Sequence, residues 1–227
     1  MVTGLAGSAG EFAEPAGDRG ARAVLLAVDP PWPLSSSSEV SGAPLVVHAV
    51  RALLDSNVVG EVLLLASRAA GDRLVALLDA EHRAAVRVAS SPPAEWLRSS
   101  DAVLVHDVLH PLTPVALVAT VLAGARQRSA PVVPVLPVTD TIKRLDADGF
   151  LLDTVDRAGL RTGQAPLALP ARQLAEALAT GPATGPASVG ELLARLTGPV
   201  YTVPGDPLAF ELRGPWDVRL AESLGQA

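Results

Sequence analysis

The sequence predicts an α/β fold: a doubly wound, mostly parallel sheet with a protruding β-hairpin arm. Three observations predict it. Short continuous apolar runs recur along the chain, stretches with apolar residues at helical spacing lie between them, and an Asp-Gly pair stands between two further strand-like runs. Continuous apolar runs are typical of parallel strands covered on both faces, and strands that alternate with helices favour right-handed crossovers around one sheet.

The first two thirds of the chain supply the parallel sheet. Thr113 is a plausible N-cap, with Pro114 at the first helical position of the helix that follows. The apolar runs predict strands at residues 23–28, 61–66, 84–89, 101–106 and 131–136. The helical patterns between them cover residues 45–54, 72–81 and 115–128.

The pattern changes after residue 136. Residues 142–146 and 150–154 flank Ala147-Asp148-Gly149, and Asp-Gly between two such runs is a hairpin signal. Residues 138–160 are therefore predicted to form an antiparallel arm that leaves the main sheet. Beyond the arm, helices are predicted at 170–179, 188–196 and 215–224, a late strand at 199–203, a turn-rich linker at 180–186 and another short strand after the Gly-Asp-Pro turn at 205–207.

Composition excludes several classes of function. The 227 residues include 24 acidic and 18 basic ones, a net charge of −6. An acidic chain binds nucleic acid poorly, because neutralised phosphates supply most of that affinity. The absence of cysteine excludes disulfides, thiolate nucleophiles and Cys-type zinc sites. Residues 1–20 suggest a disordered tail, and no apolar run is long enough to span a bilayer. We expect a cytoplasmic protein with one domain at residues 21–227.

Candidate site residues follow the predicted strands, because ligands of open α/β sheets bind beyond the carboxyl ends of strands. His106 and Asp107 end one buried run. Two interpretations remain open: Asp107 binds a metal ion or a substrate hydroxyl, or it caps a turn beside a core histidine. The four histidines are too scattered along the chain to predict a metal site.

The arm carries residues suited to phosphate. Residues 138–144 (VTDTIKR) combine hydroxyls, a carboxylate and cations, among them Lys143, the only lysine of the chain. They suit a phosphorylated polyol, or else form a solvated hairpin base. Arg157, in VDRAGL, suits bidentate phosphate recognition, or else forms a surface ion pair.

Three segments together resemble one enzyme family. They are LVHDVLHPL at 104–112, VVPVLPVTDTIKRLDADGFLLDTVDRAGL at 132–160 and VPGDPLAFELRGPWDVRLAE at 203–222. Their order and spacing resemble 2-C-methyl-D-erythritol 4-phosphate cytidylyltransferase. The resemblance implies a Rossmann-like fold of the nucleotide-diphospho-sugar transferase type. It also implies CTP and methylerythritol phosphate as substrates, Mg²⁺ as cofactor, and a homodimer whose arm reaches the neighbouring active site.

The resemblance also implies roles for individual residues. Asp107 and Arg157 become the candidate catalytic residues, and Asp107 the candidate Mg²⁺ ligand. Thr141 and Arg157 match arm residues that contact methylerythritol phosphate across the family's dimer. The candidate substrate-binding residues are Asp107, His110, Thr141, Lys143, Arg157 and Thr184.

Several positions depart from the family's pattern. Active relatives hold CTP with a glycine-rich loop that contains an arginine and a Pro-Lys pair. Residues 28–39 here contain no glycine, arginine or lysine, and their three prolines remove N–H donors that would cradle phosphates. Residues 90–97 do not match the cytosine-recognition segment. His110 stands in place of an arginine, and Glu211 in place of a lysine.

These departures predict a cytidylyltransferase-like protein with weak or no activity, a pseudoenzyme of isoprenoid biosynthesis. Three alternatives stay open. The chain is a non-catalytic binding or regulatory protein, forming a heterodimer in which it lends Thr141 and Arg157 to an active homologue. Or it is a nucleotidyltransferase of altered specificity, with the serines at 35–38 in a rebuilt loop. Or it is a working cytidylyltransferase whose N-terminal half has diverged.

Overall fold

The computed structural model describes residues 20–27, 34–98, 100–181 and 186–225. Among them, eight strands form the main sheet, in the order β10-β7-β11-β6-β1-β4-β5, with β12 pairing with β7. The strands are β1 (Ala21–Leu26), β4 (Val59–Leu65), β5 (Val86–Ala89), β6 (Ala102–Asp107), β7 (Val132–Pro137), β10 (Arg161–Gly163), β11 (Leu167–Pro170) and β12 (Tyr201–Pro204).

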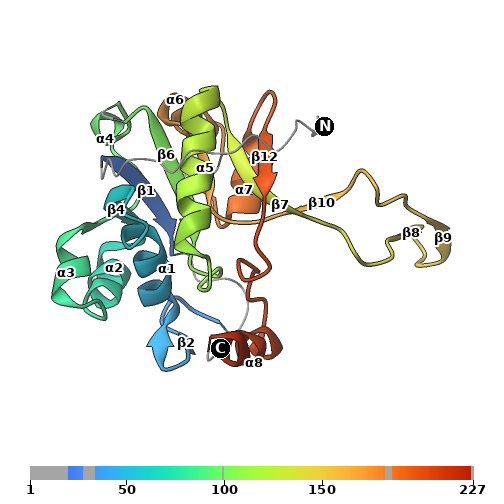
Figure 1. The fold of residues 1–227 in the computed structure, drawn as a ribbon, viewed down its shortest axis with the longest axis horizontal. Coiled ribbons are helices and arrows are strands. Elements are labelled where there is room, and N and C mark those ends of the chain that lie inside the picture. Colours follow the sequence, from blue (N-terminus) through green and yellow to red (C-terminus); the bar gives the residue numbers. More distant parts are fainter. Residues whose placement is uncertain (1–19, 28–33, 99, 182–185, 226–227) are drawn as a thin grey trace.

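The sheet is parallel through β5, β4, β1 and β6, while β11 and β10 run antiparallel to their neighbours. Helices cover both faces (Figure 1). One buried core joins the sheet to α1, α2, α5 and α8, and a second joins its other face to α4, α6 and α7. This arrangement confirms the predicted fold class. The helices are α1 (Leu45–Leu54), α2 (Arg68–Val75), α3 (Ala80–Ala84), α4 (Ala94–Arg98), α5 (Val115–Arg128), α6 (Ala171–Ala179), α7 (Val189–Arg195) and α8 (Pro215–Leu224).

Two predicted helix features are wrong. The single helix at 72–81 is two helices, because Asp79 is the N-cap of α3 and its side chain accepts a hydrogen bond from the His82 N–H. The N-cap of α5 is Pro114, not Thr113. The Thr113 hydroxyl instead donates to the carbonyl of His110 at 2.9 Å, so it stabilises the turn before the helix.

The sequence patterns also miss some elements. Strand β11 lies between β6 and β7, and no strand was predicted at its residues. A small hairpin of β2 (Glu39–Val40) and β3 (Ala43–Pro44) precedes α1, and α4 follows β5. The strand expected after the turn at 205–207 does not form in the described part of the chain. Residues 1–19 of the tail expected at 1–20, and the centre of the expected linker, 182–185, lie outside the described residues.

The arm extends from the body as predicted (Figure 1). Its hairpin consists of β8 (Lys143–Leu145) and β9 (Leu151–Thr154). Gly149 has a φ of +86°, which favours glycine, and the Asp146 carboxylate accepts the N–H groups of Asp148 and Phe150 across the turn. The turn is therefore held by its own side chains, and the hairpin strands are exposed throughout.

Candidate functional site

Asp107 is the last residue of β6, which lies on one side of β1 while β4 and β5 lie on the other side. Leu26 of β1 pairs with it, so the carboxyl ends of both strands meet there. Asp107 is only 2% exposed. The Leu109 N–H donates to its Oδ1 at 2.9 Å, whereas Oδ2 is buried and accepts no hydrogen bond of normal geometry from the described residues. The Asp107 carboxyl group thus lies where ligands of such sheets bind.

The environment of Asp107 changes its protonation. Burial raises the pKa of its carboxyl from 3.8 to about 7. The Leu109 N–H opposes this rise, the negative charge of Glu211 adds to it, and the Val189 N–H opposes it. Both the neutral and the ionised form are therefore populated near neutral pH.

Two histidines lie beside Asp107. Burial lowers the pKa of His106 to about 3, and the charge of His110 contributes to this lowering. Burial also lowers the pKa of His110, to about 4. Their rings are tilted, with centroids 6.2 Å apart. Both ring nitrogens of His106 and Nδ1 of His110 are buried without a hydrogen-bond partner among the described residues. Both side chains are therefore neutral at neutral pH.

A cavity of about 220 Å³ opens beside Asp107. Glu211 is exposed and lines it as well. None of the described lining residues is a lysine or an arginine, so the charged members are two carboxylates. The lining consists of Asp107, His110, Gly163, Gln164, Ala165, Ser188, Val189, Gly190, Leu193 and Glu211.

Gln164 shapes this pocket, although no sequence pattern pointed to it. Its Nε2 donates to the carbonyls of Asp206 and Ala209 at 2.8 and 3.0 Å, and its Oε1 accepts the Asp206 N–H at 3.0 Å. The Leu212 N–H also donates to the carbonyl of Leu109 at 2.8 Å. These bonds fasten the C-terminal turn to the sheet and so hold Glu211 near Asp107.

The serine run at residues 35–38, just before the β2–β3 hairpin, forms a closed turn. The Ser35 and Ser37 hydroxyls lie 2.9 Å apart, and the Ser35 N–H donates to Oγ of Ser38 at 2.9 Å. The carbonyls of Ser36 and Ser38 accept the first two N–H groups of α1. The hydroxyls of Ser35 and Ser37 and the N–H groups of Ser35 and Ser38 are thus used within the turn. The preceding residues 28–33 of this loop lie outside the described residues.

The predicted arm residues are exposed and separate from the cavity. Lys143 donates to the Thr154 hydroxyl at 2.6 Å, and the Arg157 guanidinium donates to the carbonyl of Thr139. Thr141 is exposed on the same arm. The structure brings Asp107, His110 and Glu211 together, but no arm residue lines their cavity. Thr184 lies outside the described residues.

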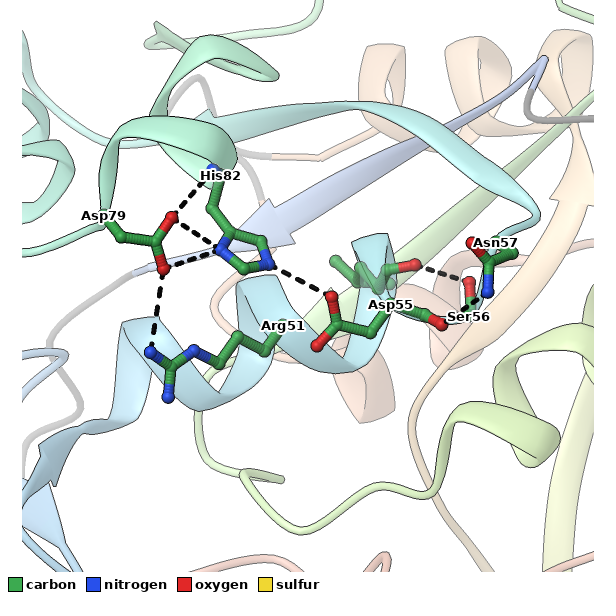
Figure 2. Close-up of polar contacts among 7 residues, drawn as sticks. Arg51, Asp55, Ser56, Asn57, Asp79 and His82 are labelled. Carbon is green, nitrogen blue, oxygen red and sulfur yellow. Dashed lines mark hydrogen bonds and ion pairs between the residues drawn. The ribbon is translucent and has the colours of Figure 1, made fainter.

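A second polar cluster joins α1 to α3 (Figure 2). Nδ1 of His82 lies 2.8 Å from both carboxylate oxygens of Asp79, and Nε2 lies 3.1 Å from Asp55. Partial burial would lower the pKa of His82, but hydrogen bonds and charge from Asp55 and Asp79 outweigh it and raise that pKa above 6.5. Arg51 approaches Asp79 at 3.6 Å. Each of these charged groups has a partner, so the cluster fastens two helices.

The described residues contain neither a metal-binding cluster nor a membrane span. No group of three or more His, Asp or Glu side chains there is placed to hold a metal ion. Nor does any helix in that part of the chain have the length and apolar character needed to cross a membrane.

Comparison with known proteins decides the family. The family model of 2-C-methyl-D-erythritol 4-phosphate cytidylyltransferase matches residues 35–226. A protein of that name from Nocardia farcinica is 38% identical over 192 residues, which cover 82% of this chain and 83% of the relative. This chain belongs to the 2-C-methyl-D-erythritol 4-phosphate cytidylyltransferase family. The resemblance inferred from the sequence is thereby confirmed.

Other members of the cytidylyltransferase family agree. The protein of the same name from Saccharopolyspora erythraea is 34% identical over 197 residues, covering 82% of this chain and 88% of the relative. The crystal structure of the Thermus thermophilus cytidylyltransferase superposes with a TM-score of 0.66 at 27% identity, covering 91% of this chain and 99% of that one. The match therefore extends over the body of the fold.

Proposed function

We propose that this chain retains the fold of a methylerythritol phosphate cytidylyltransferase but transfers the cytidylyl group very slowly or not at all. In the family's reaction, the phosphate of methylerythritol phosphate attacks the α-phosphorus of CTP, and pyrophosphate leaves. The observation that carries the proposal is the pocket at the end of β6. Among the residues that the structure describes, it is lined by Asp107 and Glu211 and by no lysine or arginine.

The charge of this pocket opposes the reaction. Nucleotidyl transfer depends on cations that stabilise the charge developing on the phosphates. Loss of one such group typically costs about 10²–10³ in rate. Glu211 stands at the position where the family resemblance places a lysine. Its carboxylate repels the substrate phosphates that a lysine would attract. The turn at Ser35–Ser38 supports the same proposal, because the hydroxyls of Ser35 and Ser37 and the N–H groups of Ser35 and Ser38 already bond within it.

Mg²⁺ would be bound only together with substrate. The ion is usually held by one or two carboxylates and by substrate phosphates. The carboxyl groups of Asp107 and Glu211 line the same pocket and match the protein's share of such a site in chemical type. Mg²⁺ there would neutralise charge on the departing pyrophosphate. In any residual transfer, His110 would contact substrate on this side, and Thr141, Lys143 and Arg157 would do so from the arm, with Arg157 as a catalytic residue. Thr184, outside the described residues, stays a candidate substrate contact from the family resemblance alone.

Pyrophosphate release tests the proposal. With CTP, methylerythritol phosphate and Mg²⁺, we expect this chain to turn over at least about 10³-fold more slowly than the Nocardia farcinica protein as control, because several cations are missing. The other nucleoside triphosphates are assayed in parallel. A rate close to that of the control would overturn the proposal. A comparable rate with another triphosphate would establish altered specificity instead.

A second candidate function is that of a dimer partner. The arm favours it, because Leu145, Phe150, Leu151 and Leu152 are each 56% or more exposed there. Exposed apolar surface of this kind marks protein contacts. Through it the chain would form a homodimer, or pair with an active homologue and present Thr141 and Arg157 to the homologue's site.

Co-expression with a tagged active homologue tests this partnership. We expect the native chain to co-purify with the tagged homologue. The double variant Phe150→Asp/Leu151→Asp should no longer co-purify with it, because charge on the arm would disfavour burial of the arm in an interface. The matched control is Leu77→Asp, an exposed leucine on the body. Retention of the double variant, or a native chain that remains monomeric alone and beside the homologue, would contradict this function.

A further inference from the structure

A larger cavity lies between α4 and α6, at the other end of β6 from Asp107. It is bordered by Asp101, which precedes β6, and by Pro170, which pairs with the first residue of that strand, Ala102. The two helices contact each other and cover the same face of the sheet (Figure 1). None of the described residues lines both this cavity and the pocket of Asp107. The cavity is therefore separate from the candidate active site.

The size and walls of this cavity suit a small organic molecule. Its volume is about 730 Å³, within the ~300–1,000 Å³ typical of such sites. Leu97 is buried, whereas Ala175 is exposed, so the wall runs from the core to the surface. Water in contact with an apolar wall is unfavourable, so the wall favours a ligand that has an apolar part. Eight of the thirteen described lining residues are apolar, among them Pro92, Ala94, Leu97, Ala171, Ala175 and Leu178.

Two arginines without partners border the cavity. Arg98 is the last residue of α4, and Arg172 lies in the first turn of α6. Both are exposed, and neither side chain forms an ion pair or a hydrogen bond within the described part of the chain. Asp101 is the one other charged residue of the described lining, so two positive charges and one negative leave a net charge of +1. Both guanidinium groups are therefore free to meet an anion that enters the cavity.

The charge of Arg172 does not favour its own helix. Helix α6 has no acidic residue in its first turn, and Pro170 provides no side-chain cap. A positive charge there is repelled by the positive end of the helix dipole. Because Arg172 also has no ion-pair partner among the described residues, nothing in that part of the chain compensates its charge. An anion bound in the cavity would do so.

These charges and walls select one class of ligand. A guanidinium group matches a carboxylate through two parallel N–H donors. One singly charged carboxylate balances the net charge of +1, whereas a triphosphate carries several negative charges and has no extended apolar chain. An amine would be repelled by both arginines. A carboxylate with an apolar chain satisfies the arginines and the apolar wall together.

We propose that the cavity between α4 and α6 binds a small carboxylate that carries an apolar chain. The carboxylate accepts N–H groups from Arg98 and Arg172, and the chain packs against Leu97 and Leu178. This site goes beyond the proposed function, since it uses neither Asp107 nor the arm. Either proposal can therefore fail without the other.

Amide NMR spectra of the whole chain, titrated with sodium octanoate, test the proposal. Octanamide has the same chain without the charge, and sodium acetate has the charge without the chain. We expect octanoate to cause saturable shifts at the amides of Leu97, Arg172 and Ala175, and both controls to bind about 10-fold or more weakly. Absence of saturation with octanoate, or equal affinity for octanamide, would overturn the proposal.

The position of the shifts and the choice of head group provide further checks. Octanoate shifts centred on Leu109 and Glu211 would place the carboxylate in the candidate active site and overturn the proposal. Shifts centred on Phe150 and Leu151 would show only adsorption to the exposed arm, with the same consequence. Tighter binding of octyl phosphate than of octanoate at the cavity would show a phosphate site instead.

A matched pair of arginine variants assigns the head group. Arg172→Gln removes one guanidinium group from an exposed position, so it should fold normally and weaken octanoate binding about 10-fold or more. Arg73→Gln makes the same change on the exposed surface of α2, outside the cavity, and should leave the affinity unchanged. Equal octanoate affinities in the two variants would overturn the contact with Arg172.

A second pair of variants tests the apolar wall. Ala175→Asp places a carboxylate on the wall at an exposed position, where it should repel octanoate and weaken its binding about 10-fold or more. Ala116→Asp, at an exposed position of α5, is the control and should bind octanoate like the native chain. Undiminished binding by Ala175→Asp would show that the ligand does not lie along α6, and the proposal would be wrong.

Discussion

Replacing Asp107 with asparagine is expected to stabilise the folded protein above neutral pH. Burial raises the pKa of this carboxyl from 3.8 to about 7, so the folded state binds the proton more tightly than the unfolded chain does. The resulting stability is fully present below about pH 3.8 and is lost as the pH rises through about 7. At about 1.36 kcal/mol per pKa unit, the loss is on the order of a few kcal/mol. Asparagine does not ionise and retains an acceptor for the Leu109 N–H.

Urea unfolding of both proteins, at about pH 5 and about pH 8, measures this effect. The gain from Asp107→Asn should be a few kcal/mol larger at the higher pH. His106 and His110 titrate in both proteins, so the difference between the proteins isolates residue 107. Asp148→Asn, on the exposed tip of the arm, is the matched control and should show no pH-dependent gain. If the free energy of unfolding changed equally with pH in the native chain and in Asp107→Asn, ionisation of Asp107 would not destabilise the folded state, and the prediction would be contradicted.

Substitution of Gly205 by alanine is expected to destabilise the fold by about 2–4 kcal/mol, the range of a broken buried hydrogen-bond network. A Cβ at this position would lie 2.1 Å from Oε1 of Gln164 and 3.1 Å from the backbone carbon of Val135. Gln164 cannot move aside without breaking its bonds to Asp206 and Ala209. The turn that carries Glu211 would therefore separate from the sheet.

Thermal and urea unfolding measure the cost of this substitution. Gly159→Ala is the matched control, because a Cβ there meets no atom within 4 Å and its backbone is not left-handed. The control should unfold within about 0.5 kcal/mol of the native chain, as ordinary surface substitutions do. A Gly205→Ala protein as stable as Gly159→Ala would show that the turn tolerates a shift of Gln164.

The local patterns of the sequence were sufficient to predict the parallel sheet, the arm and most helices. They failed where a distant residue decides the local structure. Residues 167–170 form a strand only because β6 and β7 lie on either side of it, and nothing in LALP itself favours a strand over a helix start. The helix predicted at 72–81 was split by a cap at Asp79, a residue that also fits a continuous helical pattern.

The candidate site was predictable in part for the same reason. Asp107 was found because it ends a strand, and Glu211 because the family resemblance places a lysine there. Gln164 gave no signal, since its partners lie 42 and 45 residues further along the chain. The pairing of the Ser35 and Ser37 hydroxyls was equally hidden, because composition shows donors without showing what they already bind.

The ladder between β7 and β10 connects the arm to the pocket. It pairs Arg161 with Pro137 and Gly163 with Val135, so it closes the base of the arm. The next residue is Gln164, which holds the turn of Glu211. A partner that changes the orientation of the arm would therefore displace the strands of this short ladder. Displacement of β10 would in turn move Gln164, which lines the pocket. By thermodynamic linkage, any change that such a partner makes in ligand affinity must be matched by an equal change that the ligand makes in partner affinity.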